Sequence, residues 1–188
     1  MNIVLLSGSI VGSKTRTAMN EAMQVLADKY PDVTATMIDL AEYDVQFSDG
    51  RNYLEYPGDT GYVTSAIMNA DALMIGTPVF QASIPATLKN IFDLLPQNAL
   101  LDKVVSMIVT AGSPKHFLMP EQQLKPILAY MKAHIVQTYV FIEEKDFMRK
   151  QIVNDDVKFR IERLVEDTVT LTETHAQIRE TKEAAYDF

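Results

Sequence analysis

The feature that most constrains the fold is a regular alternation between short apolar runs and amphipathic helical patterns. A short apolar run bounded by turn residues is typical of a strand that is buried on both faces of a sheet. Such runs occur at residues 2–6, 33–40, 73–76, 104–109 and 135–142, and each precedes a segment with helical periodicity. Strands that alternate with helices form a parallel sheet with helices on both faces, connected by right-handed crossovers.

This pattern predicts an α/β protein of the flavodoxin-like type, a three-layer sandwich around a five-stranded parallel sheet in the order 2-1-3-4-5. We expect residues 1–188 to form one domain, because a chain of this length can bury a substantial core. Residues 143–154 have a linker-like, polar composition, and a long terminal helix is expected from about residue 155, with an apolar stripe from Val157 to Ile178. In this strand order the loops after the first, third and fourth strands meet at one edge of the sheet, where ligands bind in such folds.

The composition excludes several kinds of partner and chemistry. The formal net charge of −8 argues against nucleic acid or an anionic membrane as a partner, since both attract basic proteins. The chain has no cysteine, which excludes disulfides and thiolate catalysis, and its three histidines lack the spacing of metal ligands. We expect no metal site. No apolar run is long enough to span a bilayer or to act as a signal peptide, so the expected location is the cytoplasm.

The loop after the first strand, residues 7–17, is rich in small and hydroxyl-bearing residues and runs directly into a helix. Glycine lets the backbone approach a ligand closely, and the N–H groups at a helix amino terminus favour an anion. The loop is therefore predicted to bind phosphate, with hydroxyls and cations supplied by Ser9, Ser13, Lys14, Thr15, Arg16 and Thr17. It also approximates the P-loop motif G-x-x-x-x-G-K-[ST], except that Ser13 occupies the position of the second glycine.

Residues 73–90 pass from an apolar strand through Gly76-Thr77-Pro78 into a helix that Ser83 is expected to cap. The loop between this strand and this helix carries no acid, base or metal ligand. Its proline, aromatic ring, small hydroxyls and backbone groups suit a flat, conjugated ligand. A further loop of small residues, Thr110 to His116, follows the fourth strand, and we expect it at the same edge of the sheet.

Together these stretches resemble the NAD(P)H-dependent FMN reductases of flavodoxin-like fold. The resemblance covers roughly residues 3 to 142. It is closest in T-P-V-F-Q-A-S-I-P-A-T-L-K-N-I-F-D-L-L from Thr77 to Leu95, in Thr110 to His116, and in L-K-P-I-L from Leu124 to Leu128. Within this family the chain is most similar to the reductases that accompany sulfonate monooxygenases.

The resemblance implies that the cofactor is FMN and that NADPH or NADH is the hydride donor. It implies contacts to the FMN phosphate from Ser9, Ser13, Lys14, Thr15 and Arg16. Further contacts, to the isoalloxazine ring, the ribityl chain and the pyrimidine end, are implied for Pro78, Val79, Phe80, Ser83, Thr110, Gly112 and Ser113. His116 lies beside the last of these loops, which makes it a candidate for contact with flavin or nicotinamide; the alternative is that it only caps the loop or faces water. No side chain is expected to act as a catalytic acid or base, because hydride passes directly from nicotinamide C4 to flavin N5.

The resemblance leaves the electron acceptor open between free flavin, a quinone, an azo compound and another small molecule. The sulfonate-linked reductases resemble one another in having an inserted tyrosine, associated with flavin release, at the position of Gln122. The absence of that tyrosine here favours FMN held as a prosthetic group. By analogy we expect a homodimer or homotetramer. Two other classes of function are the alternatives: a P-loop phosphotransferase, and a non-catalytic flavodoxin-type electron carrier, which would bind FMN but leave it oxidised in the presence of NAD(P)H.

Overall fold

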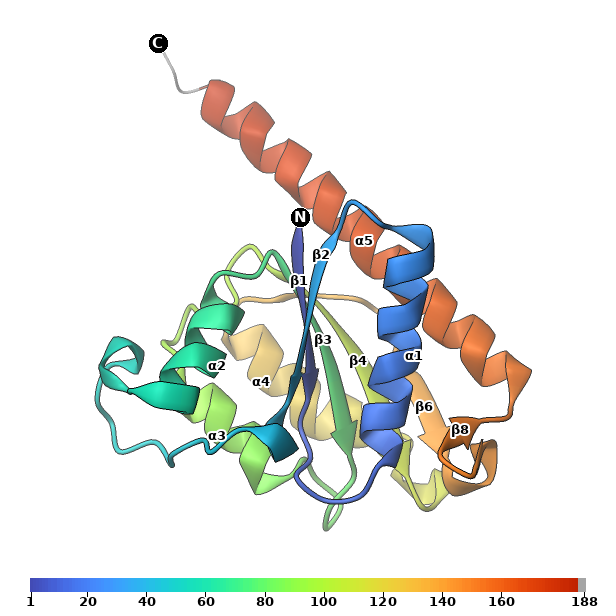
Figure 1. Ribbon diagram of the computed structural model, residues 1–188. Coiled ribbons are helices and arrows are strands. Elements are labelled where there is room, and N and C mark those ends of the chain that lie inside the picture. Colours follow the sequence, from blue (N-terminus) through green and yellow to red (C-terminus); the bar gives the residue numbers. More distant parts are fainter. Residues whose placement is uncertain (186–188) are drawn as a thin grey trace.

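In the computed structural model, which describes residues 1–185, a parallel sheet lies between two layers of helices (Figure 1). The strands are β1 (Asn2–Ser7), β2 (Thr34–Asp39), β3 (Ala72–Pro78), β4 (Val104–Ala111), β5 (His134–Ile135) and β6 (Val140–Glu143). The strand order is β2-β1-β3-β4-β5, β6 also pairs with β4, and every one of these pairs is parallel. The predicted fold class and the order 2-1-3-4-5 are confirmed.

The outer edge of the sheet differs from the prediction of a single fifth strand over residues 135–142. Two short segments take its place, β5 beside Val104 and β6 beside Ile108, so the sheet has six strands in five positions. Between them the Tyr139 hydroxyl donates to the Phe117 carbonyl at 2.7 Å, and its ring packs on the Phe117 ring. Apolar periodicity predicts burial of a strand but does not determine whether an edge ladder is continuous.

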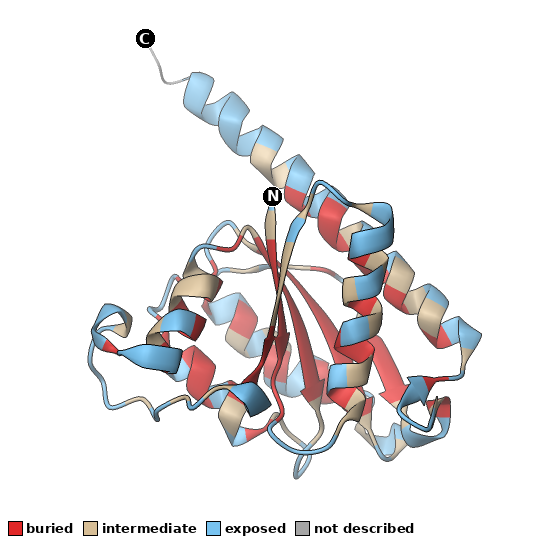
Figure 2. Ribbon diagram, in the orientation of Figure 1, coloured by how far each residue is buried: buried red, intermediate tan, exposed pale blue. Residues whose placement is uncertain are grey.

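The helices cover both faces of the sheet. Helices α1 (Lys14–Lys29) and α5 (Asp155–Ala184) cover one face, and α2 (Gly58–Met68), α3 (Ala86–Leu94) and α4 (Lys125–Tyr130) cover the other. Alternate strand side chains pack against opposite helix layers. Leu5 and Met74 pack towards α1 and α5, whereas Leu6 and Ile75 pack towards α2 and α3. Figure 2 shows the resulting core, with the central strands β1, β3 and β4 largely buried and the outer helix faces exposed.

The terminal helix α5 begins where the sequence predicted, with the Asn154 side chain accepting a hydrogen bond from the Asp156 N–H at 3.1 Å. Its buried residues end at Thr172, because the helix extends past the sheet (Figures 1 and 2). The predicted stripe is therefore wrong in its last part, where Leu171 and Ile178 are exposed. Within residues 1–185, no helix is both long enough and apolar enough to cross a membrane.

The segment 143–154, predicted as a linker, has a defined structure. A 3-10 turn (Glu144–Asp146) leads into a hairpin of β7 (Phe147–Met148) and β8 (Gln151–Ile152). The buried Asp146 carboxylate accepts from the Glu143 N–H at 2.9 Å and from the Asn154 side-chain amide at 2.8 Å. These two hydrogen bonds close the segment on itself, so the turn is held in a fixed position beside the end of β6.

Candidate active site

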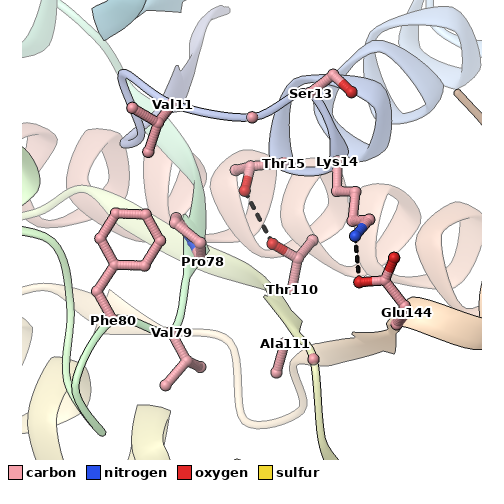
Figure 3. A pocket seen from close by; sticks show the side chains of 12 residues that line it. Val11, Ser13, Lys14, Thr15, Pro78, Val79, Phe80, Thr110, Ala111 and Glu144 are labelled. Carbon is pink, nitrogen blue, oxygen red and sulfur yellow. Dashed lines mark hydrogen bonds and ion pairs between the residues drawn. The ribbon is translucent and has the colours of Figure 1, made fainter.

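The loops that follow β1, β3 and β4 converge at the carboxyl edge of the sheet around a cavity of about 340 Å³ (Figure 3). This volume lies within the range of small-molecule sites. The cavity is lined by Val11, Gly12, Ser13, Lys14, Thr15, Pro78, Val79, Phe80, Thr110, Ala111, Gly112 and Glu144. The predicted convergence of three loops is therefore present in the structure. Eight of the predicted site residues lie in the wall: Ser13, Lys14, Thr15, Pro78, Val79, Phe80, Thr110 and Gly112.

The amino end of α1 opens into this cavity. Gly12 adopts a left-handed conformation, with φ of 78°, and turns the chain into the helix at Ser13. Within the described chain the Ser13 side chain makes no capping hydrogen bond, and the first turn of α1 contains no acidic residue. The first turn of this 16-residue helix thus lines the cavity, and no side chain caps its free N–H groups. Their positive partial charge suits a phosphate group.

Three residues of the predicted phosphate set, Ser9, Arg16 and Thr17, lie outside the cavity wall, and Thr17 lines a separate pocket. The Ser9 hydroxyl accepts from the Val11 N–H at 3.2 Å and donates to the Val11 carbonyl at 2.7 Å, which fixes the shape of the loop. The Arg16 guanidinium pairs with Asp39 at 3.2 Å and with Glu42, joining α1 to the end of β2. In this structure the Ser9 and Arg16 side chains support the loop and the helix that form the cavity.

The floor of the cavity joins α1 to β4 through two threonines. The Thr15 and Thr110 hydroxyl oxygens lie 2.8 Å apart, and both residues are buried. The Val79 N–H donates to the Thr110 carbonyl at 3.0 Å, which extends the contact between β3 and β4 beyond the regular ladder. Pro78 and Val79 are thereby fixed next to Thr110, and Figure 3 shows their side chains on the cavity wall.

A tight turn presents Phe80 at the mouth of the cavity. The Phe80 N–H donates to the Ser83 carbonyl and the Ser83 N–H donates to the Phe80 carbonyl, both at 2.9 Å. The two central residues, Gln81 and Ala82, both have left-handed φ values of 47° and 61°. Ser83 therefore belongs to this turn rather than to the helix cap predicted for it, and Pro85 occupies the cap position of α3.

This turn allows a prediction about stability. Asn-Gly is the preferred pair where both central residues of a two-residue hairpin turn have positive φ. Replacing Gln81 and Ala82 with Asn and Gly should raise the free energy of unfolding by about 0.5–1 kcal/mol, because Asn and Gly adopt positive φ with less steric strain than Gln and Ala. The extra conformational entropy that glycine loses on folding is smaller than this gain. Urea denaturation measures the change, with Ala82→Val as a control that should lower stability. An unchanged or lower stability of the Asn-Gly variant would contradict the assigned turn.

The loop after β4 places its predicted residues in different environments. Gly112 lines the cavity, whereas the Ser113 hydroxyl accepts from the Lys115 N–H at 3.3 Å and caps a 3-10 turn (Pro114–His116). His116 ends this turn and is half-buried, outside the cavity wall. A π-helical turn (Pro120–Leu124) follows and contains the exposed Gln122.

Sequence reasoning did not single out Val11, Gly12, Ala111 and Glu144 as site residues, although all four line the cavity. Val11, Gly12 and Ala111 have no side-chain chemistry to mark them, but each lies in a loop that was predicted to form the site. Glu144 lies in the segment predicted as a linker, far along the chain from the three loops. No signal in the sequence pointed to it.

Comparison with known proteins agrees with this geometry. A family model described as NADPH-dependent FMN reductase matches residues 1–147. An NAD(P)H-dependent FAD/FMN reductase of Geobacillus thermodenitrificans is 35% identical over 170 residues, covering 90% of this chain and 92% of its own. An NADH-dependent FMN reductase, SfnF, of Pseudomonas fluorescens is 29% identical over 175 residues, covering 93% and 94%.

Among solved structures, an NADH:FMN oxidoreductase (EMOB) in its apo form superposes with a TM-score of 0.75 at 27% sequence identity, covering 90% of this chain and 89% of its own. The match of the family model spans most of the chain and includes all three loops around the cavity. The chain therefore belongs to the NADPH-dependent FMN reductase family and is a flavin reductase that uses a nicotinamide nucleotide.

Proposed function

We propose that FMN binds in the cavity with its phosphate at the amino end of α1, and that NADPH or NADH reduces it there. The observation that carries this proposal is the uncapped start of α1, which opens into a cavity with apolar residues on its other side. Ser13 and Thr15 offer hydroxyl donors, and Lys14 offers a cation, at the same end of the helix. These groups fit a phosphate monoester, which accepts several hydrogen bonds and carries negative charge.

The remaining wall fits the flavin ring. Pro78, Val79 and Phe80 form an apolar surface, and the backbone around Gly112 is open to close approach because no atom lies within 4 Å of a Cβ built at that position. When bound, FMN supplies the redox chemistry, since its N5 atom accepts the hydride. The chain's own residues then bind, orient and shield the ring, and Phe80 excludes water from one edge of it. This division of roles explains a cavity wall with few ionisable groups.

We further propose that the enzyme acts in the cytoplasm on a small-molecule acceptor such as free flavin, a quinone or an azo compound, and that it assembles as a homodimer or homotetramer. Support for assembly comes from an apolar groove of about 530 Å³ between α3 and α4. Phe92, Leu95, Pro126 and Ile127 line the groove, and Tyr130 stands at its side with 64% of its surface exposed. An exposed aromatic side chain beside an apolar groove is typical of a protein contact.

Assembly through this groove makes a prediction about Tyr130. Tyr130→Asp should convert the wild-type oligomer to a monomer of about 21.1 kDa, because it places a charge in an apolar contact. Light scattering after size-exclusion chromatography measures the mass. Phe159→Asp is the matched control, since Phe159 is also 64% exposed but lies on α5, across the sheet from the groove. An oligomer that survives the change at Tyr130 would place the interface elsewhere.

The reductase assignment is tested by anaerobic absorbance of the purified protein with FMN, before and after addition of NADPH or NADH. The flavin bands should shift on binding and bleach within seconds, and the faster nucleotide identifies the preferred donor. Bound flavin that stays oxidised with both nucleotides would support an electron carrier instead. Failure to bind FMN at all would refute the proposed site.

A further inference from the structure

An acidic side chain stands next to the cation of the proposed phosphate site. The Lys14 ammonium pairs with the Glu144 carboxylate, and both residues line the cavity (Figure 3). Their side chains are 41% and 64% exposed, so the pair lies at the mouth of the cavity and is open to solvent. A carboxylate therefore occupies the position beside Lys14 that an anionic ligand group would also favour.

The segment that carries Glu144 holds it in this position. Asp146 closes the turn through its hydrogen bonds to Glu143 and Asn154, and the β7–β8 hairpin follows directly. The neighbouring cation, Lys145, is engaged by Glu143 at 3.0 Å, and this hydrogen bond raises the pKa of the Lys145 ammonium. Within the described residues the ion pair of Glu144 is the one with Lys14, which joins the start of α1 to the turn after β6.

We propose that Glu144 competes with the flavin phosphate for Lys14 and thereby makes FMN exchangeable. The inference rests on the proposed position of the phosphate at the amino end of α1. In the free protein the carboxylate neutralises Lys14, so a bound phosphate gains the Lys14 contact only by displacing Glu144. The displaced carboxylate also stays near the phosphate and repels it. Both effects weaken the binding of a phosphorylated flavin, whereas a flavin without phosphate does not experience them.

The competition has a consequence for the role of the cofactor. A reductase that binds FMN weakly releases it between turnovers and can use it as a substrate. This conclusion runs against the prosthetic role that Gln122 favoured in the sequence. The side chain of Gln122 is exposed on the π-helical turn, whereas Glu144 lies in the cavity wall beside the proposed phosphate site.

The test compares Glu144→Gln with the wild type in titrations of FMN and riboflavin at low salt, followed by flavin fluorescence. Glu144→Gln should lower the Kd for FMN about three- to tenfold and slow FMN dissociation by a similar factor, the size expected for a partly exposed charge contact. Its Kd for riboflavin should stay within about twofold, because riboflavin lacks the phosphate. In a Lys14→Met background the same substitution should change FMN affinity less, since no ammonium remains to be released.

Glu162→Gln is the matched control. Glu162 pairs with Lys29 at 2.5 Å between α5 and α1, with side chains 43% and 50% exposed, and it lies outside the cavity wall. The substitution Glu162→Gln removes the same charge from a similar ion pair and should leave the affinities for FMN and riboflavin unchanged. Thermal melts of both variants verify that each is folded.

Different outcomes refute different claims. If the wild type prefers FMN to riboflavin and Glu144→Gln leaves that preference unchanged or reduces it, the competition is wrong but the phosphate site stands. An equal gain for FMN and riboflavin would also overturn it, because the carboxylate would then act on the ring. If neither protein distinguishes FMN from riboflavin, the proposed phosphate position itself fails.

Discussion

Ser13→Asp is expected to weaken FMN binding at least about 100-fold while leaving the fold as stable as the wild type or more stable. The two effects have opposite signs because one position serves two purposes. Ser13 is the N-cap of α1, yet its side chain makes no capping hydrogen bond within the described chain. Aspartate is a strong N-cap residue, and an anion at this end of a helix adds about 0.3–1 kcal/mol through the helix dipole.

The loss of binding follows from the same location. A carboxylate at Ser13 occupies the start of α1, where the proposed site holds the flavin phosphate. Repulsion between like charges about 4 Å apart amounts to several kcal/mol at an effective dielectric constant near 20. Isothermal titration with FMN and with riboflavin measures the effect, and the riboflavin affinity should change little. Ser13→Ala should weaken FMN binding less, about tenfold, because it removes one hydrogen bond to the phosphate without adding a charge. Retention of FMN by Ser13→Asp would exclude a phosphate at this helix end.

Gly76→Ala should lower the free energy of unfolding by about 1–3 kcal/mol, the cost of overpacking a core contact. Gly76 lies in β3 under α1, and a Cβ built there meets the Met19 Cγ and Sδ atoms at 2.5 Å and the Thr15 Cγ2 atom at 3.1 Å. Met19 is fully buried, so either its side chain must repack within the core or α1 must shift away from the sheet. A shift of α1 should also separate Thr15 from Thr110 and weaken FMN binding.

Urea denaturation tests the stability change, with Gly112→Ala as the control for a glycine without a close neighbour. No atom lies within 4 Å of a Cβ built at Gly112, so this substitution should alter stability by less than about 0.5 kcal/mol. Gly76→Ala with wild-type stability would show that α1 is not packed against β3 as described here.

The fold could be predicted from the sequence because its main signals are local. Runs such as Val104 to Val109 are apolar throughout, and a strand covered by helices on both faces requires that composition. The errors occur where tertiary contacts decide. Tyr139 contacts Phe117 at the break between β5 and β6, and α5 extends past the sheet so that Ile178 has no core to join. The periodicity of the chain shows neither the Tyr139–Phe117 contact nor the extension of α5 past the sheet.

The loops that form the site could be predicted from the sequence, but the role of every side chain in them could not. The topology brings residues 11–15, 78–80 and 110–112 to one cavity. Loop composition cannot distinguish a hydroxyl that contacts a ligand from one that shapes the loop, as Ser9 does through Val11. Nor can it show that Arg16 is drawn away by Asp39 and Glu42. Glu144 reaches the site through a turn that Asp146 closes, an arrangement that depends on the folded structure.

A crystal structure of the FMN complex tests most directly whether the amino end of α1 holds the flavin phosphate. We predict the phosphate within about 3 Å of the backbone N–H groups that begin α1, with the ring against Pro78, Val79 and Phe80. We also predict that Glu144 has moved off Lys14. A phosphate bound away from the start of α1, or a flavin ring outside this cavity, would contradict the account.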